Sequence, residues 1–131
     1  MDTSASSVPS ISPWQLAALI GTPDAPLILD VRREEKFAAS PRIIATAQRC
    51  APEDVAAFAV SAPPRKVVVY CVYGHNVSAE AVALLRNAGW DALALAGGIE
   101  GGQDGVDRPD DISAWRASPA PTVAKPAGGR A

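Results

Sequence analysis

The chain has 131 residues, a typical length for one domain. Its 12 Lys and Arg against 14 Asp and Glu give a net charge of −2, which offers no electrostatic reason to expect nucleic acid as a partner. A hydrophobic content of 48% excludes a wholly disordered chain. No run approaches the roughly 18 apolar residues of a membrane span, and the Ser-rich start lacks the pattern of a signal peptide. We therefore expect a cytoplasmic protein without a membrane partner.

Both ends of the sequence are predicted to be flexible tails. Residues 1–10 are Ser-rich and show no hydrophobic periodicity, and residues 118–131 are rich in Ala, Pro and Gly. The predicted domain therefore covers residues 11–117, and no internal repeat divides it.

The first half of the domain begins with a clear helix signal. Ser12 and Gln15 have the spacing of a capping box around Pro13, so a helix is predicted from Pro13 towards the stop signal at Gly21. Residues 27–31 are apolar on both faces apart from Asp30, which indicates a buried strand of a parallel sheet. A short helix over 34–39 and an ambiguous segment over 43–49, read as a short strand near an edge, complete this half.

The second half repeats the alternation of helix and strand. A helix is predicted from Pro52, a strand over 67–71, a helix over 78–88, a weaker strand over 92–95, a flexible glycine-rich stretch over 97–105 and a last helix over 109–117. Strands that alternate with helices imply right-handed crossovers. The predicted fold class is thus α/β, with a mostly parallel central sheet and helices on both of its faces.

Ligands of such sheets bind at the carboxyl ends of the strands, where Asp30 and Cys71 lie. Cys71 ends the strongest predicted strand, and a loop containing Gly74 leads from it into the next helix. This arrangement aims backbone N–H groups and a helix N-terminus at the sulfur, which favours its thiolate form and binds anions. The sequence therefore predicts a cysteine nucleophile that attacks or carries an anionic group.

Four segments in order resemble the rhodanese family. They are Leu29-Asp30-Val31-Arg32 followed by Phe37, the Cys71-x-x-Gly74 loop, residues 84–90 (LLRNAGW) and residues 95–101 (LAGGIEG). The likeness covers about residues 11–101. It implies an α/β sulfurtransferase that needs no cofactor. Its loop cysteine would take sulfane sulfur from thiosulfate as a persulfide and pass it to cyanide or another thiophilic acceptor.

The loop departs from the family's usual pattern. Family sulfurtransferases have a six-residue loop that ends in Arg, whereas residues 71–77 make a seven-residue loop with Val77 in the place of that Arg. Seven-residue loops resemble the rhodanese-fold phosphatases and arsenate reductases, although these keep the Arg. Two alternatives therefore stand beside the sulfurtransferase: a cysteine-dependent phosphatase or arsenate reductase, and a non-catalytic rhodanese module. Lys36 also stands where the family often has Glu.

Cys71 is the expected catalytic residue. The remaining site residues are expected to bind substrate, and they are Asp30, Arg32, Val72, Tyr73, Gly74, His75, Asn76, Val77 and Ser78. Arg32 or Arg33 is a candidate for the cation that the loop lacks. His75 is read either as a donor to the anion or as a solvent-facing residue.

The other candidates have plainer interpretations. Asn76 and Ser78 are interpreted mainly as helix caps, and Trp14 as a packing residue. Cys50 is interpreted as structural, and a disulfide with Cys71 is disfavoured by a reducing compartment. One His and two Cys lack the paired ligand spacing of a zinc site, so no metal is expected. The expected partners are a small anionic sulfur donor and a thiophilic acceptor, and no protein partner follows from the sequence.

Overall fold

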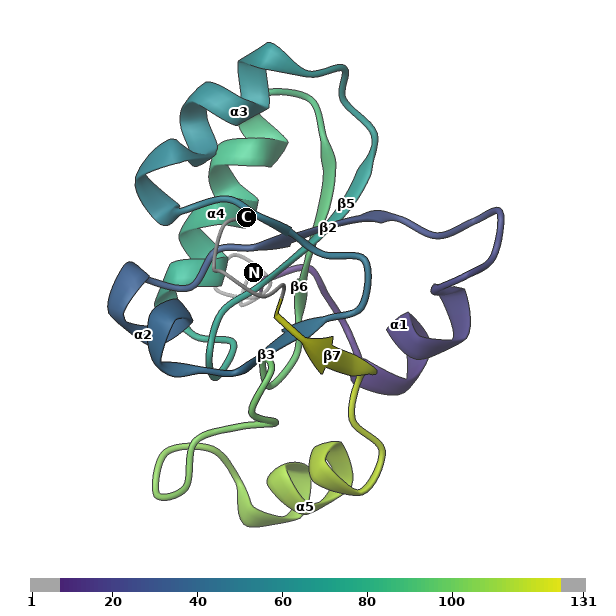
Figure 1. The fold of residues 1–131 in the computed structure, drawn as a ribbon, viewed down its shortest axis with the longest axis vertical. Helices are drawn as coiled ribbons and strands as arrows, with labels where there is room; N and C mark the ends of the chain where they lie inside the picture. Colours follow the sequence, from purple (N-terminus) through teal and green to yellow (C-terminus); the bar gives the residue numbers. More distant parts are fainter. Residues whose placement is uncertain (1–7, 126–131) are drawn as a thin grey trace, which may run out of the picture.

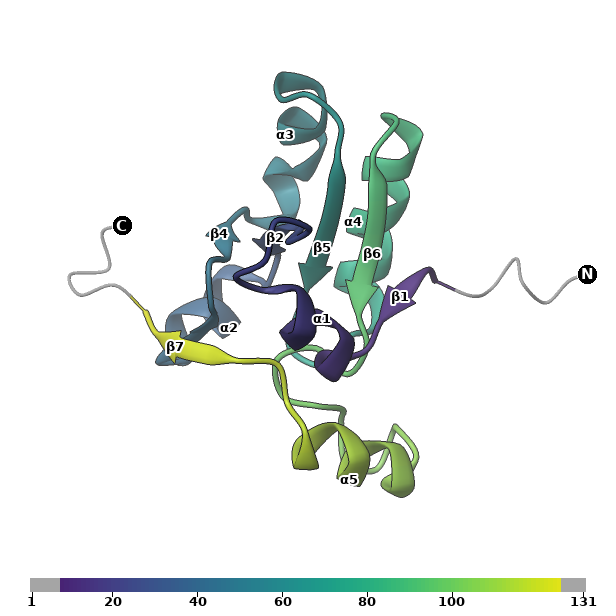
Figure 2. The ribbon, with the colours of Figure 1, turned by 90° about the vertical axis from the view of Figure 1, so that its right-hand side faces the viewer.

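A five-stranded parallel sheet lies at the centre of the fold (Figures 1 and 2). The computed structural model describes residues 8–125, so the parts of the predicted tails at 1–7 and 126–131 lie outside the described residues. The strand order is β1-β6-β5-β2-β4, and every pairing is parallel. The strands are β1 (Ser10–Ile11), β6 (Asp91–Leu95), β5 (Lys66–Tyr70), β2 (Leu27–Asp30) and β4 (Gln48–Arg49).

Helices cover both faces of this sheet, which confirms the predicted α/β class. Figure 2 shows α3 and α4 on one face and α1 on the other. The helices are α1 (Pro13–Leu19), α2 (Glu34–Ala39), α3 (Val55–Ser61), α4 (Asn76–Asn87) and α5 (Pro109–Ala117), with a 3₁₀ turn at Pro52–Asp54 before α3. Within residues 8–125, no helix has both the length and the apolar character that crossing a membrane requires.

Local sequence signals account for the start of α1. The Ser12 hydroxyl accepts a hydrogen bond from Gln15 N at 3.1 Å, and Gln15 Oε1 accepts one from Ser12 N at 3.0 Å. This is the predicted capping box, with Pro13 at the first helical position. The prediction that Trp14 packs inside is wrong, because 47% of this residue is exposed on α1.

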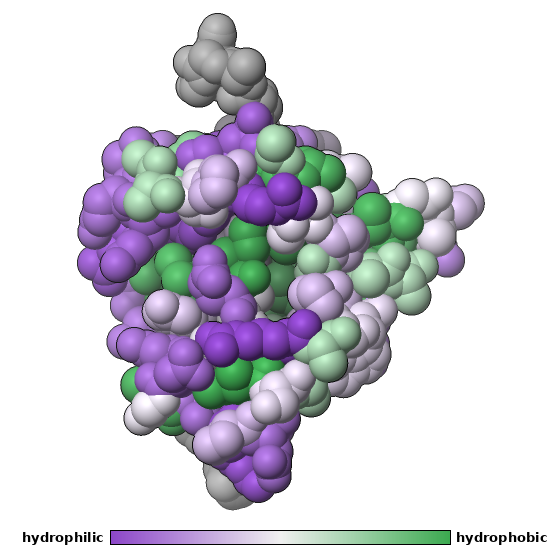
Figure 3. Space-filling view, turned by 60° about the horizontal axis from the view of Figure 1, so that its bottom comes forward, coloured by the Kyte–Doolittle hydropathy of each residue, from purple (hydrophilic) through white to green (hydrophobic). Residues whose placement is uncertain are grey.

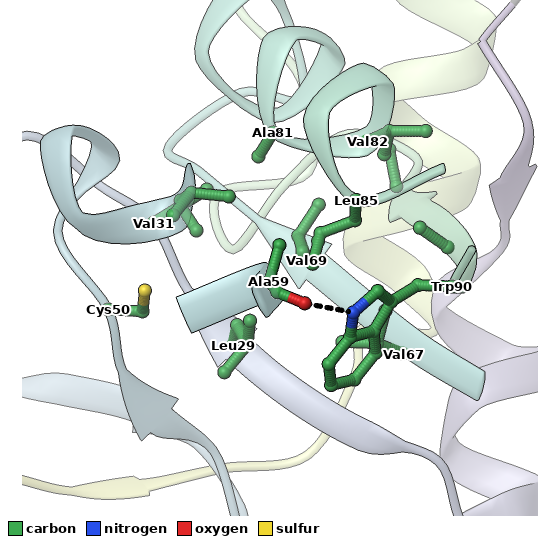
Figure 4. Packing of buried hydrophobic residues seen from close by; sticks show 13 residues of the cluster. Leu29, Val31, Cys50, Ala59, Val67, Val69, Ala81, Val82, Leu85 and Trp90 are labelled. Carbon is green, nitrogen blue, oxygen red and sulfur yellow. Dashed lines mark hydrogen bonds between the residues drawn. The ribbon is translucent and has the colours of Figure 1, made fainter. Parts of the chain in front are cut away.

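The core divides into two layers because the central strands are apolar on both faces. Leu29, Val67 and Val69 pack towards α3 and α4, whereas Ile28 and Val68 pack towards α1. Figure 4 shows the first layer, in which Trp90 Nε1 donates a hydrogen bond to the Ala59 carbonyl at 3.0 Å. The buried indole thus has a partner for its only polar atom.

The segment 118–125 differs from the predicted flexible tail. Strand β7 (Thr122–Ala124) pairs antiparallel with β3 (Arg42–Ile44), and Ala120 is buried. Arg42 Nε donates to Thr122 Oγ1 at 2.8 Å, and Lys125 N donates to the Pro41 carbonyl at 3.0 Å. The strand forms because β3 supplies a distant partner that the composition of the segment does not reveal.

The ambiguous segment at 43–49 resolves into two short strands. Its first residues belong to β3, and its last belong to β4, which is the edge strand of the parallel sheet. The predicted edge position is therefore correct for β4. Strand β1 begins at Ser10, one residue before the predicted start of the domain.

Candidate functional site

Cys71 directly follows the central strand β5, at the carboxyl end of the parallel sheet. It is 6% exposed and lines a cavity of about 230 Å³. Figure 3 looks towards this end of the molecule, where hydrophilic and hydrophobic residues alternate over the surface. The other residues that line the cavity are Arg32, Arg33, Lys36, Val72, Tyr73, His75, Asn76 and Val77.

The backbone that follows Cys71 has a continuous row of unused donors. Within residues 8–125, none of the backbone N–H groups of residues 72–78 donates to a protein acceptor. The last of them belong to the first turn of α4, whose first helical hydrogen bond runs from Ala79 N to the His75 carbonyl. Such a row of N–H groups at a helix N-terminus attracts anions. The loop therefore has free backbone donors where the sequence predicts an anion site, and that site stays a prediction.

The Ser78 hydroxyl contacts the Cys71 sulfur, and Ser78 is not a helix cap. Cys71 Sγ lies 3.4 Å from Ser78 Oγ, which in turn donates to the His75 carbonyl at 3.2 Å. Ser78 is fully buried inside α4, and Asn76 is the first residue of the helix. The capping interpretation of both residues is wrong because α4 begins two residues earlier than predicted. A serine hydroxyl can rotate to donate to a thiolate, so the same contact serves both forms of the sulfur.

The glycine-rich segment holds the loop in place and is not a loose stretch. Ile99 N donates to the Cys71 carbonyl at 3.1 Å, and Glu100 N donates to the Val72 carbonyl at 3.0 Å. A Cβ on Gly98 would lie 2.4 Å from the Val72 carbonyl oxygen, and one on Gly74 would lie 2.9 Å from Gly97 N. Both Gly74 and Gly98 have positive φ. Glycine is therefore required where the two backbones meet.

Asp30 and Arg32 form a buried ion pair beneath the cavity. Arg32 Nη2 and Nε donate to Asp30 Oδ2 at 2.7 and 3.1 Å, and Arg32 N donates to Asp30 Oδ1 at 3.0 Å. Tyr70 adds its hydroxyl, which donates to Asp30 Oδ2 at 2.9 Å and accepts from Ile44 N at 3.1 Å. The carboxylate is thus satisfied by the residues around it and does not reach the cavity lining.

Charge states within this group follow from burial and pairing. Burial by itself lowers the pKa of Arg32, but the hydrogen bonds and charge of Asp30 outweigh it and raise the pKa above the usual value. Burial, followed by the charge of Asp30, raises the pKa of Tyr70. Arg32 therefore stays cationic and Tyr70 stays a donor. Arg32 is 1% exposed and therefore lies inside the molecule, not at its surface.

Three cations line the cavity, and all of them come from the segment that leads from β2 into α2. Arg32 uses Nε and Nη2 for Asp30 and the Arg42 carbonyl, whereas its Nη1 has no hydrogen-bond partner within residues 8–125. Arg33 and Lys36 are exposed at the rim and form no ion pair in the described part of the chain. The sequence offered Arg32 and Arg33 for this role, but it did not reveal that α2 places Lys36 beside them.

His75 has a carboxylate partner that the sequence did not suggest. Its Nε2 lies 3.0 and 3.1 Å from the two carboxylate oxygens of Asp107, in the segment between β6 and α5. Asp107 Oδ2 also accepts from Gln103 N at 2.6 Å. Burial by itself raises the pKa of Asp107, but the hydrogen bond from Gln103 and the pair with His75 lower it below the usual value. The histidine is therefore anchored and not simply directed at solvent.

Solved structures with the same fold come from several microorganisms. A Rhodanese_3-like domain from Anabaena is 30% identical, covers 76% of this chain and 99% of its own, and has a TM-score of 0.54. A rhodanese homologue from Thermus thermophilus is 27% identical, covers 69% of this chain and 95% of its own, and has a TM-score of 0.55. A rhodanese-related protein from Thermoplasma volcanium is 24% identical, covers 89% of this chain and 99% of its own, and has a TM-score of 0.63.

Sequence comparison leads to the same family. The search of curated proteins returned no match. The sequence profile of the rhodanese-like domain matches residues 12–104, which include the Asp30–Arg32 pair, the loop after Cys71 and the glycine-rich segment packed against it. Because this match spans well over half of the 131 residues, the chain belongs to the rhodanese-like domain family.

Proposed function

We propose that the protein is a sulfurtransferase that carries sulfane sulfur on Cys71, from an anionic donor such as thiosulfate to a thiophilic acceptor such as cyanide or a thiol. The observation that carries this proposal is the row of backbone N–H groups over residues 72–78, which follows Cys71 at the cavity and has no protein acceptor within residues 8–125. A cysteine needs such surroundings both to ionise and to hold an anionic donor. Loading starts from the reduced thiol of Cys71, which suits a cytoplasmic location.

The first half-reaction loads the enzyme. The Cys71 thiolate attacks the outer sulfur of thiosulfate, a new bond forms between Sγ and that sulfur, and the donor's S–S bond breaks. The electron pair of the broken bond leaves with sulfite. The negative charge then lies on the terminal sulfur of the persulfide, where the N–H groups of the loop can stabilise it.

The second half-reaction returns the enzyme to its starting state. A nucleophilic acceptor attacks the terminal sulfur, the bond between that sulfur and Sγ breaks, and Cys71 takes the electron pair. Donor and acceptor thus use the same cavity in turn, which is a ping-pong scheme. No cofactor takes part in either step.

Recognition of the donor falls to the backbone and to the cations at the rim. Val77 stands where family sulfurtransferases have Arg, so the bidentate grip of a guanidinium is missing from the loop. Arg33 and Lys36 line the same cavity as the sulfur and supply positive charge from the opposite wall. Val72, Tyr73 and Val77 give the cavity apolar contacts that an organic sulfur compound also fits.

The length of the loop favours one other candidate, a phosphatase or arsenate reductase. Seven residues from Cys71 to Val77 make a wider cradle than six. A phosphate-like dianion, however, is best held by a bidentate guanidinium, and no arginine lies in residues 71–77. This argument places the sulfurtransferase first.

The decisive experiment is the intact mass of the protein after incubation with thiosulfate. We expect Cys71 to gain the mass of one sulfur atom, and cyanide to remove it with release of thiocyanate. Cys71→Ser should gain nothing, whereas Cys50→Ala should load like the wild type, since Cys50 does not line this cavity. Turnover of an aryl phosphate or arsenate without sulfur loading would favour the second candidate. A protein with neither activity would be the non-catalytic module.

A further inference from the structure

An imidazole–carboxylate pair links the loop after Cys71 to the segment between β6 and α5. His75 Nε2 lies 3.0 Å from Asp107 Oδ2, and the two side chains are 34% and 21% exposed. Since a carboxylate only accepts hydrogen bonds, Nε2 carries the proton. The other ring nitrogen, Nδ1, has no hydrogen-bond partner within residues 8–125. The ring therefore offers one unengaged basic nitrogen beside the cavity of Cys71.

The pair is held from more than one side. Gln103 N donates to Asp107 Oδ2 at 2.6 Å, so the carboxylate has a fixed position of its own. The ring of Tyr73 packs against the imidazole, with 6.1 Å between the ring centroids. The lowered pKa of Asp107 keeps this carboxylate ionised at neutral pH. An imidazole oriented in this way is the arrangement that proton transfer requires.

We propose that His75 is the proton carrier of the sulfur-transfer half-reaction and that Asp107 is its positioning residue. This role rests on the sulfurtransferase activity proposed above. Nδ1 of His75 takes the proton of an acceptor thiol as its sulfur attacks the terminal sulfur of the persulfide. The bond between that sulfur and Cys71 breaks, and the imidazolium returns the proton to Sγ. The products are the acceptor persulfide anion and the neutral Cys71 thiol, so charge and protons balance.

The charges around His75 explain why a carboxylate is needed. Asp107, from the segment after β6, contacts the ring directly, and Tyr73 packs against it. The charged or titratable groups that line the same cavity are Cys71 from the end of β5, Arg32 and Arg33 from the segment before α2, and Lys36 on α2. Asp107 is therefore the carboxylate that places a negative charge next to the imidazolium that forms during transfer.

The test separates the two half-reactions. Protein loaded with thiosulfate and freed of excess donor is mixed with small thiols of graded acidity, and the loss of the persulfide mass is followed in single turnover. For weakly acidic thiols we expect at least a tenfold loss of rate in His75→Gln and in Asp107→Asn, because general base catalysis contributes about a hundredfold or more. The loss should shrink as the acceptor becomes more acidic, since such thiols arrive already ionised.

Controls distinguish proton transfer from support of the loop. Asp104 lies in the same segment between β6 and α5 but pairs with Arg116, so the rates of Asp104→Asn should match the wild type. The double variant of His75 and Asp107 should be no slower than His75→Gln alone, because the carboxylate acts through the ring. Asp107→Glu, which keeps a carboxylate, should recover part of the rate.

Each contrary result has a separate meaning. Equal losses for all thiols, or equal losses in loading, would overturn the proton-carrier role and leave a loop contact. Unchanged transfer in variants that load normally would overturn the role of His75 while leaving the sulfurtransferase intact. A wild-type protein that takes up no sulfur would overturn the sulfurtransferase proposal and this role with it.

Discussion

The two cysteines occupy closely similar places in the sheet. Cys50 follows β4 and Cys71 follows β5, and these two strands flank β2 in the same parallel sheet. Both thiols are free and nearly buried, at 8% and 6% exposed. Asp30, at the end of β2, connects the two places. Its carbonyl accepts from Cys50 N at 2.9 Å, and its carboxylate accepts from Tyr70, the residue before Cys71.

The chain that follows each cysteine makes the difference. After Cys71 come seven unused N–H groups and a helix of 12 residues. After Cys50 come Ala51 and Pro52, which has no N–H, and then the acidic first turn with Asp54. Burial and the charge of Asp54 raise the pKa of the Cys50 thiol. Position at the end of a strand therefore does not distinguish the two cysteines, whereas the residues that follow each of them do.

The largest expected effect comes from removing the negative charge of Asp30. Asp30→Asn would leave Arg32, which is 1% exposed, without a counter-charge. Loss of one partner of a buried ion pair costs about 3–5 kcal/mol of the free energy of unfolding. We expect the midpoint of urea unfolding to fall accordingly, with both cysteines becoming more accessible to thiol reagents.

A second variant keeps this prediction testable if the first unfolds. Replacing both partners, as Asp30→Asn with Arg32→Met, removes the buried charge altogether. The double variant should be more stable than Asp30→Asn alone. A single variant as stable as the wild type would mean that Asp30 does not hold the two cysteine segments together.

Alkylation compares the two thiols directly. We expect iodoacetamide to label Cys71 at least tenfold faster than Cys50 near neutral pH, as judged by peptide mass spectrometry; one unit of pKa changes the thiolate fraction about tenfold. The raised pKa of Cys50 means that its thiolate forms only at a higher pH than that of an ordinary thiol. Its labelling should therefore rise as the solution becomes more alkaline.

Accessibility has to be controlled in this measurement. Because the two residues are exposed to similar extents, a small neutral reagent tests ionisation more than access. Labelling of the unfolded protein in urea should remove the difference. Equal rates for the folded protein near pH 7 would show that the loop does not activate Cys71.

Sequence reasoning succeeded where local patterns and burial act together. The capping box at Ser12, the doubly buried strands at Leu29 and Val68, and the order of helices and strands follow from residues close to one another in the chain. It failed for β7, whose partner β3 lies about 80 residues away, as the bond between Arg42 and Thr122 illustrates. A strand of three residues carries too little pattern to predict such a pairing.

In the candidate site, too, features set by residues close in sequence were predicted, and those set by distant residues were not. Cys71 and its loop were predicted because the residues that make the cradle are consecutive. The pairing of Asp30 with Arg32 is local as well, since the two residues are two positions apart in the chain. Asp107 was missed because it contacts His75 from 32 residues away and follows the glycine-rich stretch over 97–105, which was predicted to be flexible. Its order comes from close backbone contacts, which composition does not reveal.

The smallest expected effect concerns the exposed cations at the rim of the Cys71 cavity. Arg33→Gln and Lys36→Gln should each raise the KM for thiosulfate by about twofold to fivefold, the range for exposed charges, and leave kcat unchanged. The effect should fade as ionic strength rises. Lys66→Gln, at the far end of β5 from Cys71, is the matched control and should leave KM unchanged.

Two alkylating reagents of different charge test the same cations without relying on sulfur transfer. Iodoacetate is an anion and iodoacetamide is neutral. The ratio of the iodoacetate rate to the iodoacetamide rate therefore reports the local charge around a thiol. At Cys71 the rim cations should raise this ratio, whereas near Cys50 the carboxylate of Asp54 should lower it. Removing Arg33 and Lys36 together should bring the ratio at Cys71 closer to that at Cys50. A ratio at Cys71 that does not respond would mean that Arg32 and the backbone N–H groups alone attract the anion.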